Sequence, residues 1–257
     1  MFPLKDDNPT RRFPVVTVTL IAINVVAYFL WQRGGLSLGA PGSEHFLCNL
    51  ADYAVFPYEL THWGDQVRTQ GCPVPEAPTW LTVFTSEFMH GGLLHLAGNM
   101  LFLWVFGNNV EDAMGRAKFV AFYLLAGLAA TALQTLIGPN AAVPNVGASG
   151  AIAGVLGGYI LLYPRARVLT LILIVFIPIF LRLPAMIVLG LWFLEQLLFG
   201  YYDVNSGGES GGVAYFAHIG GFVFGLLAIR AFAGARRPPP PRPRRAPVFA
   251  GYSPGRW

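Results

Sequence analysis

The sequence predicts an all-α membrane protein: a bundle of six transmembrane helices with a long interfacial first outer loop. Three observations lead to this fold class. Hydrophobic residues make up 54% of the chain and charged residues only 12%, about half the charged share of a typical soluble domain. Several apolar runs reach the roughly 20 residues that a membrane-spanning helix needs. Basic residues concentrate at both ends of the chain, which favours two cytoplasmic ends and therefore an even number of spans.

The expected spans follow the apolar runs in order, and only one run has to be divided. Val168–Phe199 is too long for one straight helix across a hydrocarbon core of about 30 Å. Pro178, Arg182 and Pro184 interrupt it, so we divide it into an interfacial or re-entrant piece, Val168–Leu181, and a fifth span. If that piece crossed the membrane, there would be seven spans. The six expected spans are Pro14–Trp31, Gly91–Val110, Phe119–Ile137, Ser149–Tyr163, Pro184–Phe199 and Val213–Phe232.

Charge and composition set the expected domain limits. Residues 1–12 form an N-terminal tail, residues 13–235 the membrane domain, and residues 236–257 a Pro/Arg-rich tail that we expect to be disordered or polyproline-like. Both tails are expected in the cytoplasm. The net charge of +4 belongs to such membrane-side segments, so we expect contact with membrane lipid and none with nucleic acid.

The first outer loop, Gly34–Thr79, is long for a connection without secondary structure. It contains apolar pieces such as Leu47–Leu60, so we expect it to lie partly in the membrane interface. It also holds both cysteines, Cys48 and Cys72, which could form a disulfide or remain two unrelated thiols. In the chain-entropy model such a bridge would contribute about 3 kcal/mol.

Four polar residues fall inside the expected spans, where polar side chains are costly and are candidates for function. His95 and Asn99 are spaced i, i+4 and share one face of the second span. Ser149 opens the fourth span within Gly147–Gly150, and His218 lies near the start of the sixth. These three spans run in the same direction, from outside to inside. The four residues should therefore lie at a similar depth, just below the outer surface.

Serine beside histidine is the pattern of nucleophilic catalysis, because a histidine base can take the hydroxyl proton near neutral pH. The backbone N–H of Ser149, at a helix N-terminus, together with His95 and Asn99, could stabilise an oxyanion. No Asp or Glu lies beside His218 in the sequence, so we interpret the pair as a dyad. His90 is a secondary candidate. His45 and His62 lack ligand spacing, so we predict no metal site, and no cofactor is expected.

Each of these residues also has a purely structural interpretation. His218 could be a packing histidine bonded to a carbonyl, and His95 and Asn99 could form an interhelical hydrogen bond. Glu195 and Gln196 in the fifth span could line a cavity or satisfy each other or the backbone. The Gly-x-Ser-Gly pattern occurs a second time around Ser210, which we interpret as a residue of a hydrophilic outer loop.

Small residues at four-residue spacing allow close helix packing in membranes. The fourth span offers Gly150 and Gly154, and the sixth offers Gly221 and Gly225. Close approach of these two spans is what a hydrogen bond between Ser149 and His218 would require.

Three motifs together resemble the rhomboid family of intramembrane proteases: His90-Gly-Gly-Leu-Leu-His95-Leu-Ala-Gly-Asn99, then Gly147-Ala-Ser-Gly150, then Ala217-His-Ile-Gly-Gly221. The resemblance covers residues from about Phe13 to Ala235. It implies Ser149 as nucleophile, His218 as base, and an oxyanion site formed by Ser149 N–H, His95 and Asn99. It also implies that the substrates are single-span membrane proteins, cut near the outer face of the membrane. For a bacterial-type member this membrane is the inner membrane.

Some positions depart from the family pattern. Many members carry a Trp-Arg pair before the second span, whereas Trp80 is followed here by Leu81. Some place an aromatic residue one turn after the nucleophile, where it can stack on the base, and this position is Ala153 here. Inactive relatives often have Pro before the nucleophile position, whereas Ala148 precedes Ser149 here. The expected function is an intramembrane serine endopeptidase, and the alternative is an inactive relative that binds membrane helices as a chaperone. Oligomeric state is not predicted.

Overall fold

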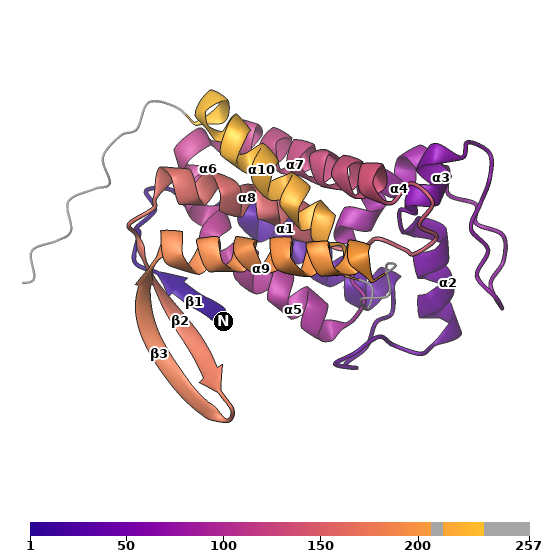
Figure 1. The fold of residues 1–257 in the computed structure, drawn as a ribbon, viewed down its shortest axis with the longest axis horizontal. Coiled ribbons are helices and arrows are strands. Elements are labelled where there is room, and N and C mark those ends of the chain that lie inside the picture. The colour runs from indigo at the N-terminus through magenta and orange to yellow at the C-terminus, as the bar shows by residue number, and fades with distance from the viewer. Residues whose placement is uncertain (207–212, 234–257) are drawn as a thin grey trace, which may run out of the picture.

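A computed structural model describes residues 1–206 and 213–233. It is mostly helical, with a small antiparallel sheet beside one end of the helix bundle (Figure 1). Ser210 and the expected tail 236–257 lie outside the described residues. The elements in chain order are β1 (Phe2–Asp6), α1 (Val15–Val26, continued by a π-helical turn, Ala27–Trp31), α2 (Glu44–Tyr53), α3 (Pro57–Thr61), α4 (Thr79–Thr85, followed by a 3-10 turn, Ser86–Phe88), α5 (Leu93–Phe102, continued by a π-helical turn, Leu103–Gly107), α6 (Asn108–Met114), α7 (Arg116–Ile137), α8 (Ser149–Leu162), β2 (Arg167–Ile174), β3 (Ile177–Pro184), α9 (Ala185–Asn205) and α10 (Tyr215–Phe232).

Helix α8 forms the centre of the bundle. Every residue from Gly150 to Tyr159 is buried, so this helix is covered on all sides, mainly by α7 and α10. A Cβ added at Gly221 of α10 would overlap the carbonyl oxygen of Gly150, and one added at Gly225 would overlap that of Gly154. The other side of the same two α8 glycines contacts Ala130 and Ala126 of α7. The absence of side chains therefore lets α8 and α10 approach each other backbone to backbone.

Three helices, α7, α9 and α10, are long and apolar enough to cross a membrane, which is consistent with a multi-pass membrane protein. A fourth candidate is the pair formed by α4 with its 3-10 turn and the α5–α6 rod, which is bent by 77° at its break. Val15–Trp31 and α8 are apolar but shorter. By length and composition, the described helices thus include three or four candidate spans, and a total of six spans remains a prediction.

The expectation of an all-α fold is wrong, because the segment after α8 is a β-hairpin. Strands β2 and β3 pair antiparallel from Arg167↔Pro184 to Ile174↔Ile177, and β1 adds to the outer side of β2. The prolines that interrupted the helical pattern belong to β3, which is an edge strand, where a missing N–H is tolerated. Val168–Leu181 is therefore neither a helix nor a span.

The N-terminal segment is also not a simple tail, because residues 2–6 are part of the folded structure. Asp6 is buried, and its Oδ2 accepts hydrogen bonds from the Tyr159 hydroxyl at 2.6 Å and from Asn109 Nδ2 at 2.8 Å. These contacts join β1 to α8 and α6. The folded unit starts well before residue 13.

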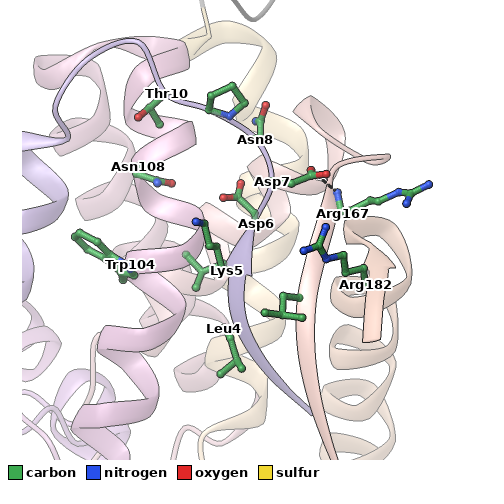
Figure 2. Close-up of a pocket in the computed structure, with 13 residues that line it drawn as sticks. Leu4, Lys5, Asp6, Asp7, Asn8, Thr10, Trp104, Asn108, Arg167 and Arg182 are labelled. Atoms are coloured by element: carbon green, nitrogen blue, oxygen red, sulfur yellow. Dashed lines mark hydrogen bonds between the residues drawn. The ribbon is translucent and has the colours of Figure 1, made fainter. Parts of the chain in front are cut away.

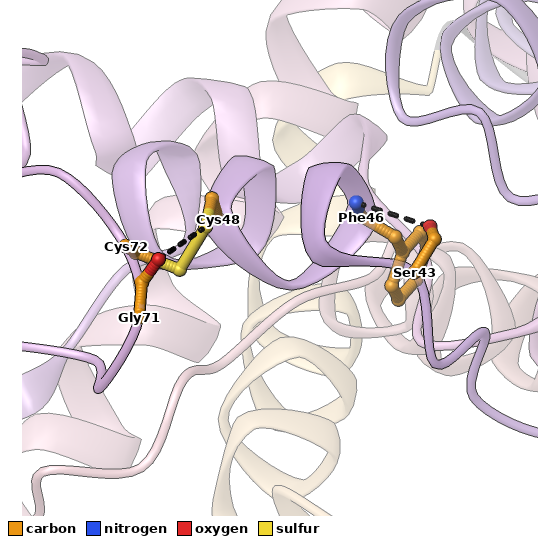
Figure 3. Close-up of a disulfide and its surroundings, with 5 residues drawn as sticks. All are labelled: Ser43, Phe46, Cys48, Gly71 and Cys72. Carbon is orange, nitrogen blue, oxygen red and sulfur yellow. Dashed lines mark hydrogen bonds between the residues drawn. A yellow bond between two sulfur atoms is a disulfide. The ribbon is translucent and has the colours of Figure 1, made fainter.

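The segment between α1 and α4 holds the short helices α2 and α3 and one cross-link. A disulfide joins Cys48 of α2 to Cys72, 24 residues later (Figure 3). Ser43 caps α2, accepting a hydrogen bond from Phe46 N–H at 3.3 Å. The bridge therefore fastens the irregular stretch before α4 to a capped helix.

Candidate active site

The structure brings Ser149, His218, His95 and Asn99 together around one cavity of about 700 Å³. They come from three helices: Ser149 begins α8, His218 lies in the first turn of α10, and His95 and Asn99 lie on α5. Most of the remaining wall is apolar, with Phe102, Ile152 and Leu156 among its residues. The four polar groups thus lie in the wall of a mainly apolar cavity.

Ser149 and His218 are in direct hydrogen-bonding contact. The distance between Ser149 Oγ and His218 Nε2 is 2.8 Å. Gly147 has a φ of +124°, a conformation that favours glycine, and this turn leads the chain into α8 with Ser149 as its first residue. The contact between α8 and α10 through their glycines brings the imidazole to the hydroxyl.

The second nitrogen of His218 also has a partner, which the sequence did not reveal. His218 Nδ1 lies 2.8 Å from Oε1 of Gln196 on α9. The amide orientation is fixed, because Gln196 Nε2 donates to the Trp192 carbonyl at 3.2 Å. Oε1 can only accept, so Nδ1 carries the proton and Nε2 presents its lone pair to Ser149. The expected dyad thus has a third, amide member, and Gln196 is not paired with Glu195.

The imidazole also has an aromatic neighbour. Trp192 lies one turn before Gln196 on α9, and its ring centroid is 5.8 Å from that of His218, at an interplanar angle of 38°. Trp192 also lines the cavity. It supplies aromatic contact with the imidazole from α9, in a protein whose α8 has only Ala153 one turn after Ser149. The only trace of this pair in the sequence is a Trp and a Gln at i, i+4 spacing within an apolar run.

His95 and Asn99 offer two hydrogen-bond donors near Gly147. Gly91 N–H donates to His95 Nδ1 at 3.2 Å, so the ring proton is on His95 Nε2. A Cβ placed on Gly147 would lie 2.7 Å from that Nε2 and 3.5 Å from Asn99 Nδ2, so both atoms face the turn that precedes Ser149. Asn99 Nδ2 is buried and has no hydrogen-bond partner. A buried amide donor without an acceptor is costly, which marks a place where an acceptor can bind.

His90 is not among the residues that line this cavity. It is fully buried, its ring lies edge-on to that of His95 with centroids 5.1 Å apart, and its backbone pairs with the Gln32 side chain. It therefore supports His95 from behind. Within residues 1–206 and 213–233, no three His, Cys, Asp or Glu side chains are grouped so that they could hold a metal ion.

Comparison with known proteins agrees with the resemblance seen in the motifs. Residues 77–234, more than half of the chain, match the family model of the rhomboid domain. Rhomboid protein 1, mitochondrial, of Saccharomyces cerevisiae is 32% identical over 152 residues, which are 57% of this chain and 40% of that protein. Rhomboid protease GluP of Bacillus subtilis is 30% identical over 144 residues, which are 56% of this chain and 24% of that protein.

A third relative is the presenilin-associated rhomboid-like protein, mitochondrial, of Bos taurus, which is 30% identical over 149 residues, or 56% of this chain and 36% of the relative. The matches span less than half the length of each of these three relatives. The family model, over residues 77–234, includes His95, Asn99, Ser149 and His218. The chain belongs to the rhomboid family.

Proposed function

We propose that this chain is an intramembrane serine endopeptidase that cleaves transmembrane segments of single-span membrane proteins near the outer membrane face. The observation that carries the proposal is the 2.8 Å contact between Ser149 Oγ and His218 Nε2, in a tautomer suited to a general base. It is supported by membership of a family in which one relative is named a protease.

The proposed reaction begins when Ser149 Oγ attacks the scissile carbonyl carbon and its proton moves to His218 Nε2. The carbonyl oxygen becomes an oxyanion, for which the donors are His95 Nε2–H, the unpartnered Asn99 amide and Ser149 N–H at the start of α8. As the C–N bond breaks, His218 returns the proton to the leaving amine. Water, activated by the same imidazole, then hydrolyses the acyl-enzyme.

Helix length supports a site below the membrane surface. With 14 residues at 1.5 Å each, α8 is about 21 Å long, shorter than a hydrocarbon core of about 30 Å. If its far end reaches one face, Ser149 lies several ångströms inside the other. In this proposal the protein has six spans, with both ends in the cytoplasm of a bacterium, and the cavity opens to the outer side of the inner membrane.

The test is cleavage of a single-span reporter by the full-length protein in lipid vesicles. Ser149→Ala is expected to abolish cleavage and covalent labelling by a fluorophosphonate, with the folded protein recovered in the same yield. Ser210→Ala, in the other Gly-x-Ser-Gly copy, is the matched control and should cleave normally. Cleavage that survives in Ser149→Ala would refute the assignment. If wild type neither cleaves nor becomes labelled but still binds the reporter helix, the protein would be a chaperone-like binder.

A further inference from the structure

The β2–β3 hairpin projects from the end of the helix bundle (Figure 1). Its tip is apolar. Residues 171–181, which form most of both strands and the turn, include no polar side chain. At the tip Val175 is 81% exposed and Phe176 92% exposed, and no described element covers them. In water, an exposed apolar hairpin of this kind would be an aggregation site.

The turn itself keeps apolar residues at a conformational cost. Strands β2 and β3 are joined by Val175 and Phe176 alone, and Val175 has a φ of +58°. Two-residue hairpin turns with positive φ strongly favour Asn and Gly, and a β-branched residue there is an outlier. Because only Val175, the first turn residue, has a positive φ, a turn with Gly first and a polar residue such as Asn second would be the ordinary solution at a water-exposed tip. The choice of Val and Phe indicates a tip that lies in an apolar medium.

The root of the hairpin has the opposite character. A cavity of about 710 Å³ there is lined by Lys5 of β1, Arg167 of β2 and Arg182 of β3, with half-exposed Trp104 in its wall (Figure 2). Arg182 pairs in register with Leu169, whose other neighbour is Lys5. Basic side chains and Trp are the groups that anchor proteins at the headgroup layer.

Two carboxylates also line this cavity, and both already have partners. Asp6 accepts from Tyr159 and Asn109, and Asp7 Oδ1 accepts from Arg167 N–H at 2.9 Å. Asp6 is buried and Asp7 is half-buried, whereas the side chains of Arg167 and Arg182 are exposed. The order along the hairpin is therefore basic root, then apolar tip, which matches lipid phosphate followed by acyl chain.

We propose that this hairpin is a membrane anchor that inserts its tip into the lipid leaflet at the face where α8 ends and α9 begins, the opposite end of α8 from Ser149. Its occupant is bilayer lipid, with anionic headgroups at the basic root. Insertion is shallow, to a depth of about 5–10 Å, because the free edge of β3 cannot satisfy its backbone groups in hydrocarbon.

The anchor is firmly joined to the helices. Pro184 ends β3 and Ala185 begins α9 without a linker. Ala185 N–H donates to the Ala166 carbonyl at 2.8 Å, and Met186 N–H to that of Pro164 at 3.1 Å. The hairpin therefore sets where α9, the helix that carries Trp192 and Gln196, starts relative to the lipid surface.

The test places an environment-sensitive NBD probe on Phe176→Cys in the full-length protein, reconstituted in vesicles with and without phosphatidylglycerol in phosphatidylcholine. Arg12→Cys, at an exposed site before α1, is the water-facing control, and Leu227→Cys, 78% exposed on α10, is the lipid-facing control. The native cysteines are bonded to each other and do not react. We expect the Phe176 probe to be quenched by lipids with a shallow spin label and to be several-fold less accessible to iodide than the Arg12 probe.

Two further arms make the result decisive. Val175→Gly with Phe176→Asn supplies the preferred turn while removing the apolar tip, so a probe at Ile174 should lose its protection in that variant. Arg167→Gln with Arg182→Gln should remove the extra protection that phosphatidylglycerol gives. Iodide access at Phe176 equal to that at Arg12 would overturn insertion. Protection that disappears when the protein is diluted in lipid would also overturn it, because a second copy would then cover the tip. Equal protection in both lipid mixtures would refute the headgroup contact.

Discussion

Gln196 is the residue whose contacts determine what His218 can do. Because its amide nitrogen is held by the Trp192 carbonyl, its oxygen accepts the proton of His218 Nδ1 and leaves Nε2 as the acceptor toward Ser149. A carboxylate in this place would also stabilise the imidazolium charge, whereas an amide mainly selects the tautomer and the ring orientation. Gln196 is thus a positioning residue in the proposed mechanism.

Replacing Gln196 with Met keeps the side-chain length and removes the acceptor. We expect kcat to fall about tenfold, the equivalent of one hydrogen bond of roughly 1.4 kcal/mol, with KM nearly unchanged. The measurement is steady-state cleavage of a reporter in vesicles, together with the ¹⁵N spectrum of His218, which should show mixed tautomers in the variant.

Two variants control this experiment. Gln196→Glu retains an acceptor for Nδ1 and should retain most of kcat. Glu195→Met makes the same kind of exchange at the exposed neighbouring position and should behave as wild type. An equal loss in Gln196→Met and Gln196→Glu would mean that packing at this position, rather than the acceptor, sustains activity.

At the scale of elements, the α8–α10 contact is the one that places His218 beside Ser149. Gly225→Ala would put a Cβ into the Gly154 carbonyl oxygen, so the two helices must separate. We expect the unfolding free energy to fall by about 1–3 kcal/mol, the usual cost of overpacking. We also expect the cleavage rate to fall by a larger fraction than the unfolding free energy does. SDS titration of the purified protein measures the first and the reporter assay the second.

Gly190→Ala in α9 is the matched control, because a Cβ there would meet no atom within 4 Å. Alanine is the better helix former by up to about 1 kcal/mol, so this variant should be as stable as wild type or slightly more so. If both glycines tolerated alanine equally, the backbone contact of α8 with α10 would not limit stability.

Part of the candidate site can be predicted from the sequence, and the reason is physical. Ser149, His218, His95 and Asn99 could be predicted to lie together because the three spans that carry them are expected to run in the same direction, and the structure places all four around one cavity. Gln196 could not be paired with His218, because Glu195 and Gln196 lie side by side on an apolar helix and nothing local says which faces the bundle. In the structure Gln196 is buried and Glu195 exposed.

The β2–β3 hairpin cannot be predicted from the sequence for a different reason. From residue 171 to residue 181 both faces of the hairpin are apolar, so the alternation that signals a half-buried strand is absent there, and the Val175–Phe176 turn lacks Gly or Asn. Its third strand comes from the opposite end of the chain, with Phe2 paired to Leu171. A pairing over such a separation leaves no local pattern, so the sequence alone predicts a tail for residues 1–12.

At the scale of the whole molecule, Asp6 connects the N-terminal strand with the helices α6 and α8. Burial, the largest cause, raises the pKa of Asp6 from its ordinary value of 3.8 to about 6, although the Tyr159 hydroxyl opposes this shift. A raised pKa means that the folded protein favours the protonated carboxyl. The contribution of the Asp6 carboxyl to the unfolding free energy is therefore complete below about pH 4, and it is lost as the pH rises through 6.

We accordingly expect wild type to gain stability between pH 7 and pH 4 relative to Asp6→Asn, by at most roughly 3 kcal/mol at 1.36 kcal/mol per pH unit. The asparagine mimics the neutral carboxyl and removes this titration. The measurements are the Tm in detergent across that pH range and the hydrogen-exchange protection factors of residues 2–6, corrected for intrinsic exchange, which should rise on acidification in wild type only. Asp7→Asn, one residue along, is the control and should keep most of the wild-type pH dependence. A Tm difference between wild type and Asp6→Asn that does not change with pH would show that β1 docks independently of this carboxyl.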